Sequence, residues 1–380
     1  MKLTNKGCNR MKWLAAVPAL LVGGLSQAQT SVTVYGVIDT NIEYVNNMSA
    51  VVPSAANGFA VGPGKNVVRM LSGGLSGSRW GLRGTEDLGG GLKAVFALES
   101  GFGSDDGKMQ QGGRLFGRQA FVGLDHASFG KVTFGRQYTS LFDGLTNFSP
   151  TGFSLQYEPL ILETGVNFRS DNVAKYTGQF GPVTAIAHWT FGNGAAGAGE
   201  VPGQFRRDSG YGASLAYLGG PFGVSVNYDQ YNPTLTAAGG TGTVKKAAVA
   251  ASYALGGVGK IVGGYRWGRS TSATDATILR DNFYWIGGNY QATSALLLTL
   301  AYYYDDAKEF LGNNIKNPWQ VSFIADYSLS KRTDLYLTTA YSKNAGLNFD
   351  SSAISFANGY FLGSDKNNMF GVALGIRHKF

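Results

Sequence analysis

Residues 31–45 read SVTVYGVIDTNIEYV, a stretch in which apolar and polar side chains alternate. One parity carries Val32, Val34, Ile38 and Ile42, and the other carries Thr33, Asp39, Asn41 and Glu43. Because successive side chains of a β-strand point to opposite faces, this stretch predicts a strand with one apolar and one polar face.

The same period of two recurs along the chain to its last residue, and it predicts about sixteen strands. The predicted spans are 31–45, 65–72 merging into 78–88, 91–102, 114–125, 130–140, 166–178, 182–192, 209–218, 221–231, 244–255, 258–269, 281–291, 295–305, 318–329, 333–343 and 369–380. Short glycine-rich joints such as LGGGL (88–92) alternate with long polar connections such as 141–165. An even number of strands with short turns at one end and long loops at the other is typical of outer-membrane barrels.

A large soluble β protein is the alternative reading of this pattern. Aromatic residues near the strand ends, such as Trp189, Tyr302 and Trp319, favour a membrane barrel because such rings gather at bilayer interfaces. The opposite parity is polar or small, which suits a wet lumen rather than a dry core. We therefore predict an all-β fold, a 16-stranded antiparallel transmembrane β-barrel.

The composition excludes several other classes of protein. Of 380 residues, 15% are charged and 44% are hydrophobic, whereas intrinsic disorder needs low hydrophobicity and high net charge. A single cysteine excludes a disulfide scaffold, and three histidines leave little material for a soft-metal site. No cluster of basic residues resembles a nucleic-acid-binding arm. We predict no cofactor, no metal and no nucleic-acid partner.

The first 28 residues, MKLTNKGCNRMKWLAAVPALLVGGLSQA, read as a secretory signal peptide. A head with four basic residues precedes an apolar stretch from Trp13 to Leu25, and Ser26 and Ala28 supply the small residues of a cleavage site. A short membrane anchor is the alternative, but the apolar stretch is too short to span a bilayer. Removal of this segment would leave residues 29–380 as the barrel, with a net charge of +8 − 4 = +4.

Five motifs follow one another along the chain: SVTVYGVIDTNIEYV (31–45), SGSRWGLRGTEDLGGGLKAVFALESGF (76–102), GGRLFGRQAFVGL (112–124), FGKVTFGRQY (129–138) and GIRHKF (375–380). Together they resemble the general trimeric porins of Gram-negative outer membranes, in their β-proteobacterial form. The resemblance implies a multi-pass homotrimer in the outer membrane, in contact with its lipid and lipopolysaccharide. It also implies that the third loop folds inward and narrows each pore, through which small hydrophilic solutes and ions pass.

The same resemblance implies a ladder of basic residues on the wall that faces acids on the inward loop. The wall candidates are Arg79, Arg83, Arg118, Arg136, Arg169 and Lys175, and the loop acids are Asp143, Glu158 and Glu163. Guanidinium groups stay charged at any working pH, so they would favour ions of one sign in a narrow water-filled gap. An alternative role for some of these arginines is to brace the wall by pairing with lumen acids such as Glu99. The loop tip NFSPTGFSLQYEP lacks the Pro-Glu-Phe-Gly stretch of many family members.

These observations predict a passive general diffusion porin that leans toward anions. A channel specific for a sugar or an anion remains a second hypothesis. An outer-membrane barrel enzyme is a third, but His126, His188 and His378 are scattered and none lies beside an evident catalytic partner.

Overall fold

The computed structural model of the protein describes residues 31–192, 200–351 and 358–380. The predicted signal peptide lies outside these residues. The strands are β1 (Ser31–Ser49), β2 (Gly64–Ser72), β3 (Arg79–Gly89), β4 (Leu92–Gly101), β5 (Gln119–His126), β6 (Gly130–Tyr138), β7 (Arg169–Phe180), β8 (Val183–Thr190), β9 (Gly210–Gly219), β10 (Phe222–Tyr231), β11 (Thr243–Ala254), β12 (Gly259–Thr271), β13 (Thr277–Gln291), β14 (Leu296–Phe310), β15 (Trp319–Ser328), β16 (Thr333–Lys343) and β17 (Asn368–Lys379). The helical turns are η1 (Ala55–Asn57), α1 (Ser140–Leu145), η2 (Thr146–Phe148), α2 (Leu160–Thr164) and η4 (Leu347–Phe349). Within the described ranges, no helix is long and apolar enough to cross a membrane.

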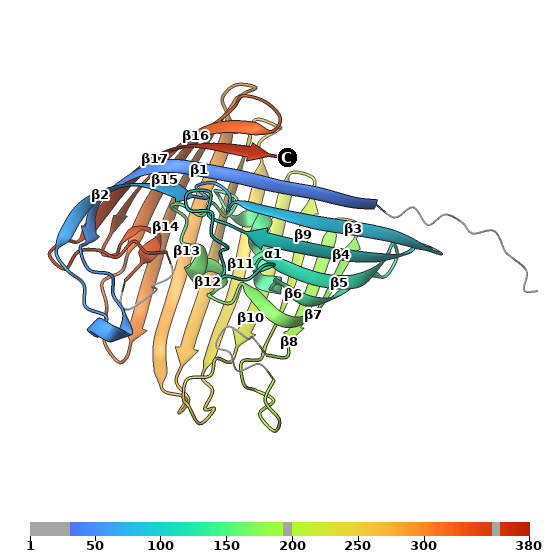
Figure 1. Ribbon diagram of the computed structural model, residues 1–380, viewed down its shortest axis with the longest axis horizontal. Helices are drawn as coiled ribbons and strands as arrows, with labels where there is room; N and C mark the ends of the chain where they lie inside the picture. Colours follow the sequence, from blue (N-terminus) through green and yellow to red (C-terminus); the bar gives the residue numbers. More distant parts are fainter. Residues whose placement is uncertain (1–30, 193–199, 352–357) are drawn as a thin grey trace, which may run out of the picture.

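The strands form one closed antiparallel barrel (Figure 1). β1 and β17 close it, in a register that runs from Val37 opposite Lys379 to Val45 opposite Gly371. Along its other edge, β1 pairs first with β3 and then with β2. β2 and β3 are therefore two halves of one wall position, separated by residues 73–78. The seventeen strands of the described chain thus fill 17 − 1 = 16 positions, which confirms the predicted fold.

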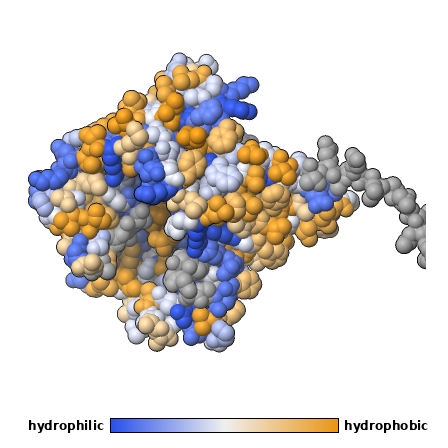
Figure 2. Space-filling view, in the orientation of Figure 1, coloured by the Kyte–Doolittle hydropathy of each residue, from blue (hydrophilic) through white to orange (hydrophobic). Residues whose placement is uncertain are grey.

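The two faces of the wall follow the alternation of the sequence. Side chains of one parity point outward, so Val34 is 62% exposed and Leu374 is 65% exposed. Side chains of the other parity, such as Asp39 and Glu99, are buried against the contents of the lumen. In Figure 2, hydrophobic residues gather on the right-hand wall, where Figure 1 places β3, β4 and β5. Such an outward apolar band matches the hydrocarbon of a bilayer.

Residues 139–168, which we call the inward segment, connect β6 to β7 and run across the lumen. At one end, the Ser140 backbone N–H donates to His188 Nδ1 on β8 over 3.1 Å. At the other end, Gln320 Nε2 on β15 donates to the Tyr157 carbonyl over 2.8 Å. Because β8 and β15 are well separated around the barrel, the segment spans the interior from one wall to the other.

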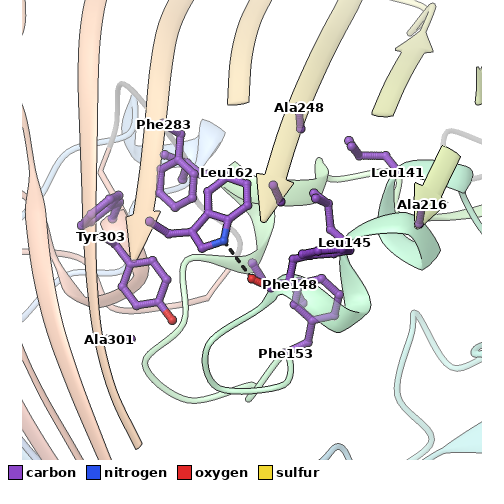
Figure 3. Close-up of a cluster of buried hydrophobic side chains, with 14 of the residues drawn as sticks. Leu141, Leu145, Phe148, Phe153, Leu162, Ala216, Ala248, Phe283, Ala301 and Tyr303 are labelled. Carbon is purple, nitrogen blue, oxygen red and sulfur yellow. Dashed lines mark hydrogen bonds between the residues drawn. The ribbon is translucent and has the colours of Figure 1, made fainter. Parts of the chain in front are cut away.

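A hydrophobic cluster fixes the inward segment to the wall formed by β9 to β14 (Figure 3). Leu141, Leu145 and Phe148 are fully buried in it. The dashed line in Figure 3 marks the bond from Trp285 Nε1 to the Phe148 carbonyl, 2.9 Å long. Gly144 sits so close to the strands that an added Cβ would collide with Ser214 and Asn227. The segment is thus a packed part of the core rather than a free loop.

Candidate pore constriction

The wall itself bends into the lumen between β2 and β3. The Asp39 carboxylate accepts hydrogen bonds from the backbone N–H groups of Gly74, Leu75 and Ser76, at 3.0, 3.0 and 2.7 Å. Tyr336 also donates its hydroxyl to Asp39, over 2.5 Å. Residues 74–76 do not pair with a neighbouring strand, so their backbone N–H groups lack the hydrogen bonds of a β-sheet. The buried Asp39 carboxylate accepts from these groups instead. We call residues 73–78 the wall insert.

Three arginines gather beside the wall insert, around one carboxylate and one tyrosine. Glu99 accepts from Arg118 Nε over 2.6 Å, and its other oxygen lies 3.6 Å from Arg79 Nε. The Tyr138 hydroxyl accepts from Arg118 over 3.1 Å and from Arg169 over 3.2 Å. The local balance is therefore three guanidinium groups against one carboxylate.

Arg169 differs from the other two because aromatic rings, not acids, surround it. Its guanidinium carbon lies 4.5 Å from the ring centre of Phe168 and 4.9 Å from that of Tyr138. Within the described part of the chain, no carboxylate lies within ion-pair distance of Arg169, and its Nε has no hydrogen-bond partner. Its charge is therefore the least compensated of the three.

These side chains face the inward segment across a cavity of about 180 Å³. The wall side consists of Leu75, Ser76, Gly77, Arg79, Arg118, Tyr138 and Arg169. The opposite side consists of Phe142, Thr146, Gly152, Phe153, Leu155 and Leu160. Leu155 is 36% exposed, so the cavity is open to the lumen on the side of the segment. We call this cavity the constriction.

The chain as a whole was compared with known proteins. A family model described as Gram-negative porin matches residues 14–347. The chain belongs to the Gram-negative porin family. It is 33% identical to an outer membrane porin protein of Bordetella pertussis, with 97% of this chain and 100% of the relative covered. It is 32% identical to outer membrane porin protein 32 of Delftia acidovorans, with 97% and 99% covered.

A solved structure of an anion-selective porin from Comamonas acidovorans superposes on this porin with a TM-score of 0.72. The two are 27% identical, and the match covers 93% of this chain and 100% of the other. Family, relatives and barrel together place the porin in the outer membrane as a multi-pass channel protein.

Two further basic candidates lie on the lumen side but outside the constriction. Lys175 pairs with Asp143 of the inward segment at 2.7 Å, and both line a neighbouring cavity of about 290 Å³. The Arg83 guanidinium lies 5.2 Å from the ring centre of Tyr35 and faces the lumen nearer the short turns. The structure therefore spreads the predicted basic ladder over three adjoining cavities.

Arg136 is a correction to the sequence prediction, because it lies on the outward face. It stands opposite Ala120 in the register, and Ala120 shares its face with Val122, which is 60% exposed. Asp171 pairs with Arg136 at 2.6 Å and with Arg114 at 2.9 Å. Arg136 also shares parity on β6 with Val132 and Phe134, which are 39% and 56% exposed, so the alternation of this strand could have indicated its direction.

The loop acids are a second correction, because Glu158 and Glu163 do not face the arginines. Both are buried, at 1% and 0% exposure. Glu158 accepts hydrogen bonds from the Ser149 and Thr151 hydroxyls of its own segment. Burial raises the pKa of both carboxyl groups, and the pKa of Glu163 lies well above its usual value. Of the predicted acids, Asp143 forms an ion pair with a member of the predicted basic ladder, Lys175.

The barrel also carries a buried charged cluster that the sequence prediction missed. Behind the inward segment, Arg266 on β12 pairs with Asp281 on β13, and Lys246 on β11 donates to the Leu162 carbonyl over 3.0 Å. These three residues lie on the lumen parity of neighbouring strands, and that parity could have revealed them. The Lys246 bond holds the second half of the inward segment against the wall, whereas the Arg266–Asp281 pair joins two neighbouring strands of that wall.

Proposed function

We propose that this porin is a general diffusion pore that prefers anions. The observation that carries the proposal is the imbalance at the constriction, where three guanidinium groups gather and one carboxylate pairs with only two of them. Burial of Glu158 and Glu163 removes the acids that would otherwise offset that charge. A fixed positive charge in a narrow aqueous passage attracts anions and repels cations. Similarity to an anion-selective porin supports the same sign.

We further propose that the porin acts as a homotrimer, surrounded by outer-membrane lipid and lipopolysaccharide, and that it catalyses no reaction. Charged side chains on a lipid-facing surface destabilise a membrane barrel. The outward cluster of Arg114, Arg136 and Asp171 is therefore better placed against another subunit than against lipid. Residues 1–28 would be removed as a signal peptide.

The test is the zero-current potential of the refolded protein in a planar bilayer under a salt gradient, with single-channel steps recorded. Conductance steps in threes and an anion-favouring potential are expected. A cation-favouring potential would overturn the proposed selectivity but leave a pore. If a barrel that is verified to be folded gives no conductance steps, the channel function is overturned and the hypothesis of an outer-membrane barrel enzyme is favoured instead.

A further inference from the structure

The two sides of the constriction differ in chemistry. The wall side offers three guanidinium groups, whereas the inward segment offers the apolar side chains of Phe142, Phe153, Leu155 and Leu160. Leu75 of the wall insert adds a further apolar contact on the same side as the arginines. An inorganic anion would interact with the guanidinium groups only and would leave the apolar surface in contact with water.

The aromatic rings at this place form an ordered stack. Tyr138 and Phe142 lie parallel, with ring centres 4.2 Å apart and an angle of 7° between the planes. Phe142 also packs against Phe153 at 4.7 Å. The edge of this stack lines the same cavity as the guanidinium of Arg169, which has no acidic partner in the described chain. A ring and a guanidinium are thus presented to one solute at the same time.

The constriction has room for a small organic solute. Its volume of about 180 Å³ accommodates a single ring with a small charged group. Guanidinium groups bind carboxylates through paired hydrogen bonds, and aromatic rings prefer offset or edge contacts with other rings.

We propose that the constriction is a binding site for small aromatic carboxylates, with benzoate as the simplest example. The carboxylate would lie against Arg169 and Arg79, and the ring would lie against Phe142 and Leu155. This proposal rests on the proposed anion-selective pore and names the class of anion that the pore holds best. It makes the constriction a weak selective site within a general pore.

The experiment measures how organic solutes reduce the chloride current of single channels in a planar bilayer. Benzoate, acetate and benzyl alcohol are compared, so that the ring and the charge are tested together and separately. We expect benzoate to halve the current at a concentration about tenfold lower than acetate does, because burial of a ring adds to the charge interaction. Benzyl alcohol, which has the ring without the charge, is expected to leave the current unchanged.

Leu155→Ser is the diagnostic variant, because it removes apolar surface from the cavity at a side chain that is already 36% exposed. We expect its half-blocking benzoate concentration to rise about threefold or more, while the acetate value stays the same. The matched control is Val166→Ser, since Val166 is 66% exposed on the same segment and does not line the constriction. This control is expected to behave as the unchanged porin.

The possible outcomes distinguish failure of the aromatic carboxylate site from failure of the proposed anion-selective pore. An anion-favouring potential with equal block by benzoate and acetate would overturn the aromatic site and keep the anion-selective pore. Equal effects of Leu155→Ser and Val166→Ser would also overturn it. A channel without anion preference would overturn the proposed function itself. The comparison of benzoate with acetate uses the unchanged porin, so it decides the matter even if a variant fails to fold.

Discussion

Replacement of Arg169 by glutamine should weaken the anion preference of the pore by a predictable amount. The constriction, at about 180 Å³, corresponds to a sphere of about 3.5 Å radius, so an ion at its centre lies about 5 Å from a lining charge. One unit charge at that distance is worth about 0.8 kcal/mol in water, or about 0.5 kcal/mol after screening in 0.1 M salt. Since the charge attracts anions and repels cations equally, Arg169→Gln should shift the anion-to-cation ratio by about 1 kcal/mol, or about fivefold.

The assay is the zero-current potential in a potassium chloride gradient. Arg169 suits this test because its guanidinium neutralises no carboxylate in the described chain, so its loss leaves no buried acid unpaired. Arg332→Gln is the matched control, because it removes the same charge from an exposed turn between β15 and β16. A potential that is unchanged in Arg169→Gln, or changed equally in Arg332→Gln, would refute the assignment of selectivity to the constriction.

Three further outcomes follow from the packing around the pore. Asp39→Ala leaves three backbone donors of the wall insert without their acceptor, at about 1–3 kcal/mol each, so a larger conductance step and a lower unfolding temperature on gels are expected. Trp285→Phe removes the bond to Phe148, worth about 1 kcal/mol, and should increase open-channel current noise. Burial raises the pKa of Asp350 from 3.8 to about 6, so the folded loop between β16 and β17 favours the protonated carboxyl group. The free energy that stabilises this loop should therefore fall by up to about 3 kcal/mol as the pH rises from about 4 to about 6, and it should change little at higher pH. The protection factor of the Tyr360 amide, which donates to Asp350, reports this loss once the intrinsic pH dependence of amide exchange is divided out, and in Asp350→Asn that protection factor should stay constant over the same pH range.

The strands were the most predictable part of the fold. Alternation predicts strands at 333–343 and 221–231, and the structure has Thr333–Lys343 and Phe222–Tyr231. The alternation of apolar and polar residues can be read from a short stretch of sequence, because the side chain of each strand residue faces either the lipid or the lumen and its neighbour faces the other. Prediction was less accurate at 114–125, where the strand begins only at Gln119. Glycine and arginine at the start of that stretch belong to a loop whose bonds come from distant residues.

The candidate site was only partly predictable. Arg79, Arg118 and Arg169 do meet at one cavity, as the family motifs imply. The direction of Glu158 could not be predicted, because it depends on hydroxyl donors at Ser149 and Thr151 that only the folded segment brings together. Such contacts arise from tertiary packing and leave no period in the sequence.

The positions of the carboxylates also bear on which solutes the pore can favour. Glu158 accepts hydrogen bonds from within the inward segment, and Glu163 lies behind that segment on the side of Arg266. The surface of the segment that faces the arginines is therefore mostly apolar, with Thr146 as its hydroxyl-bearing side chain. A sugar carries hydroxyl groups all round its ring, so those that lie against the apolar side chains would give up water without gaining hydrogen-bond partners, which is costly. An organic anion exchanges its water for guanidinium donors and buries its apolar part on the opposite side. The arrangement of arginines on the wall opposite a mostly apolar inward segment, which sets the sign of the selectivity, thus also disfavours a sugar-specific channel and favours organic anions.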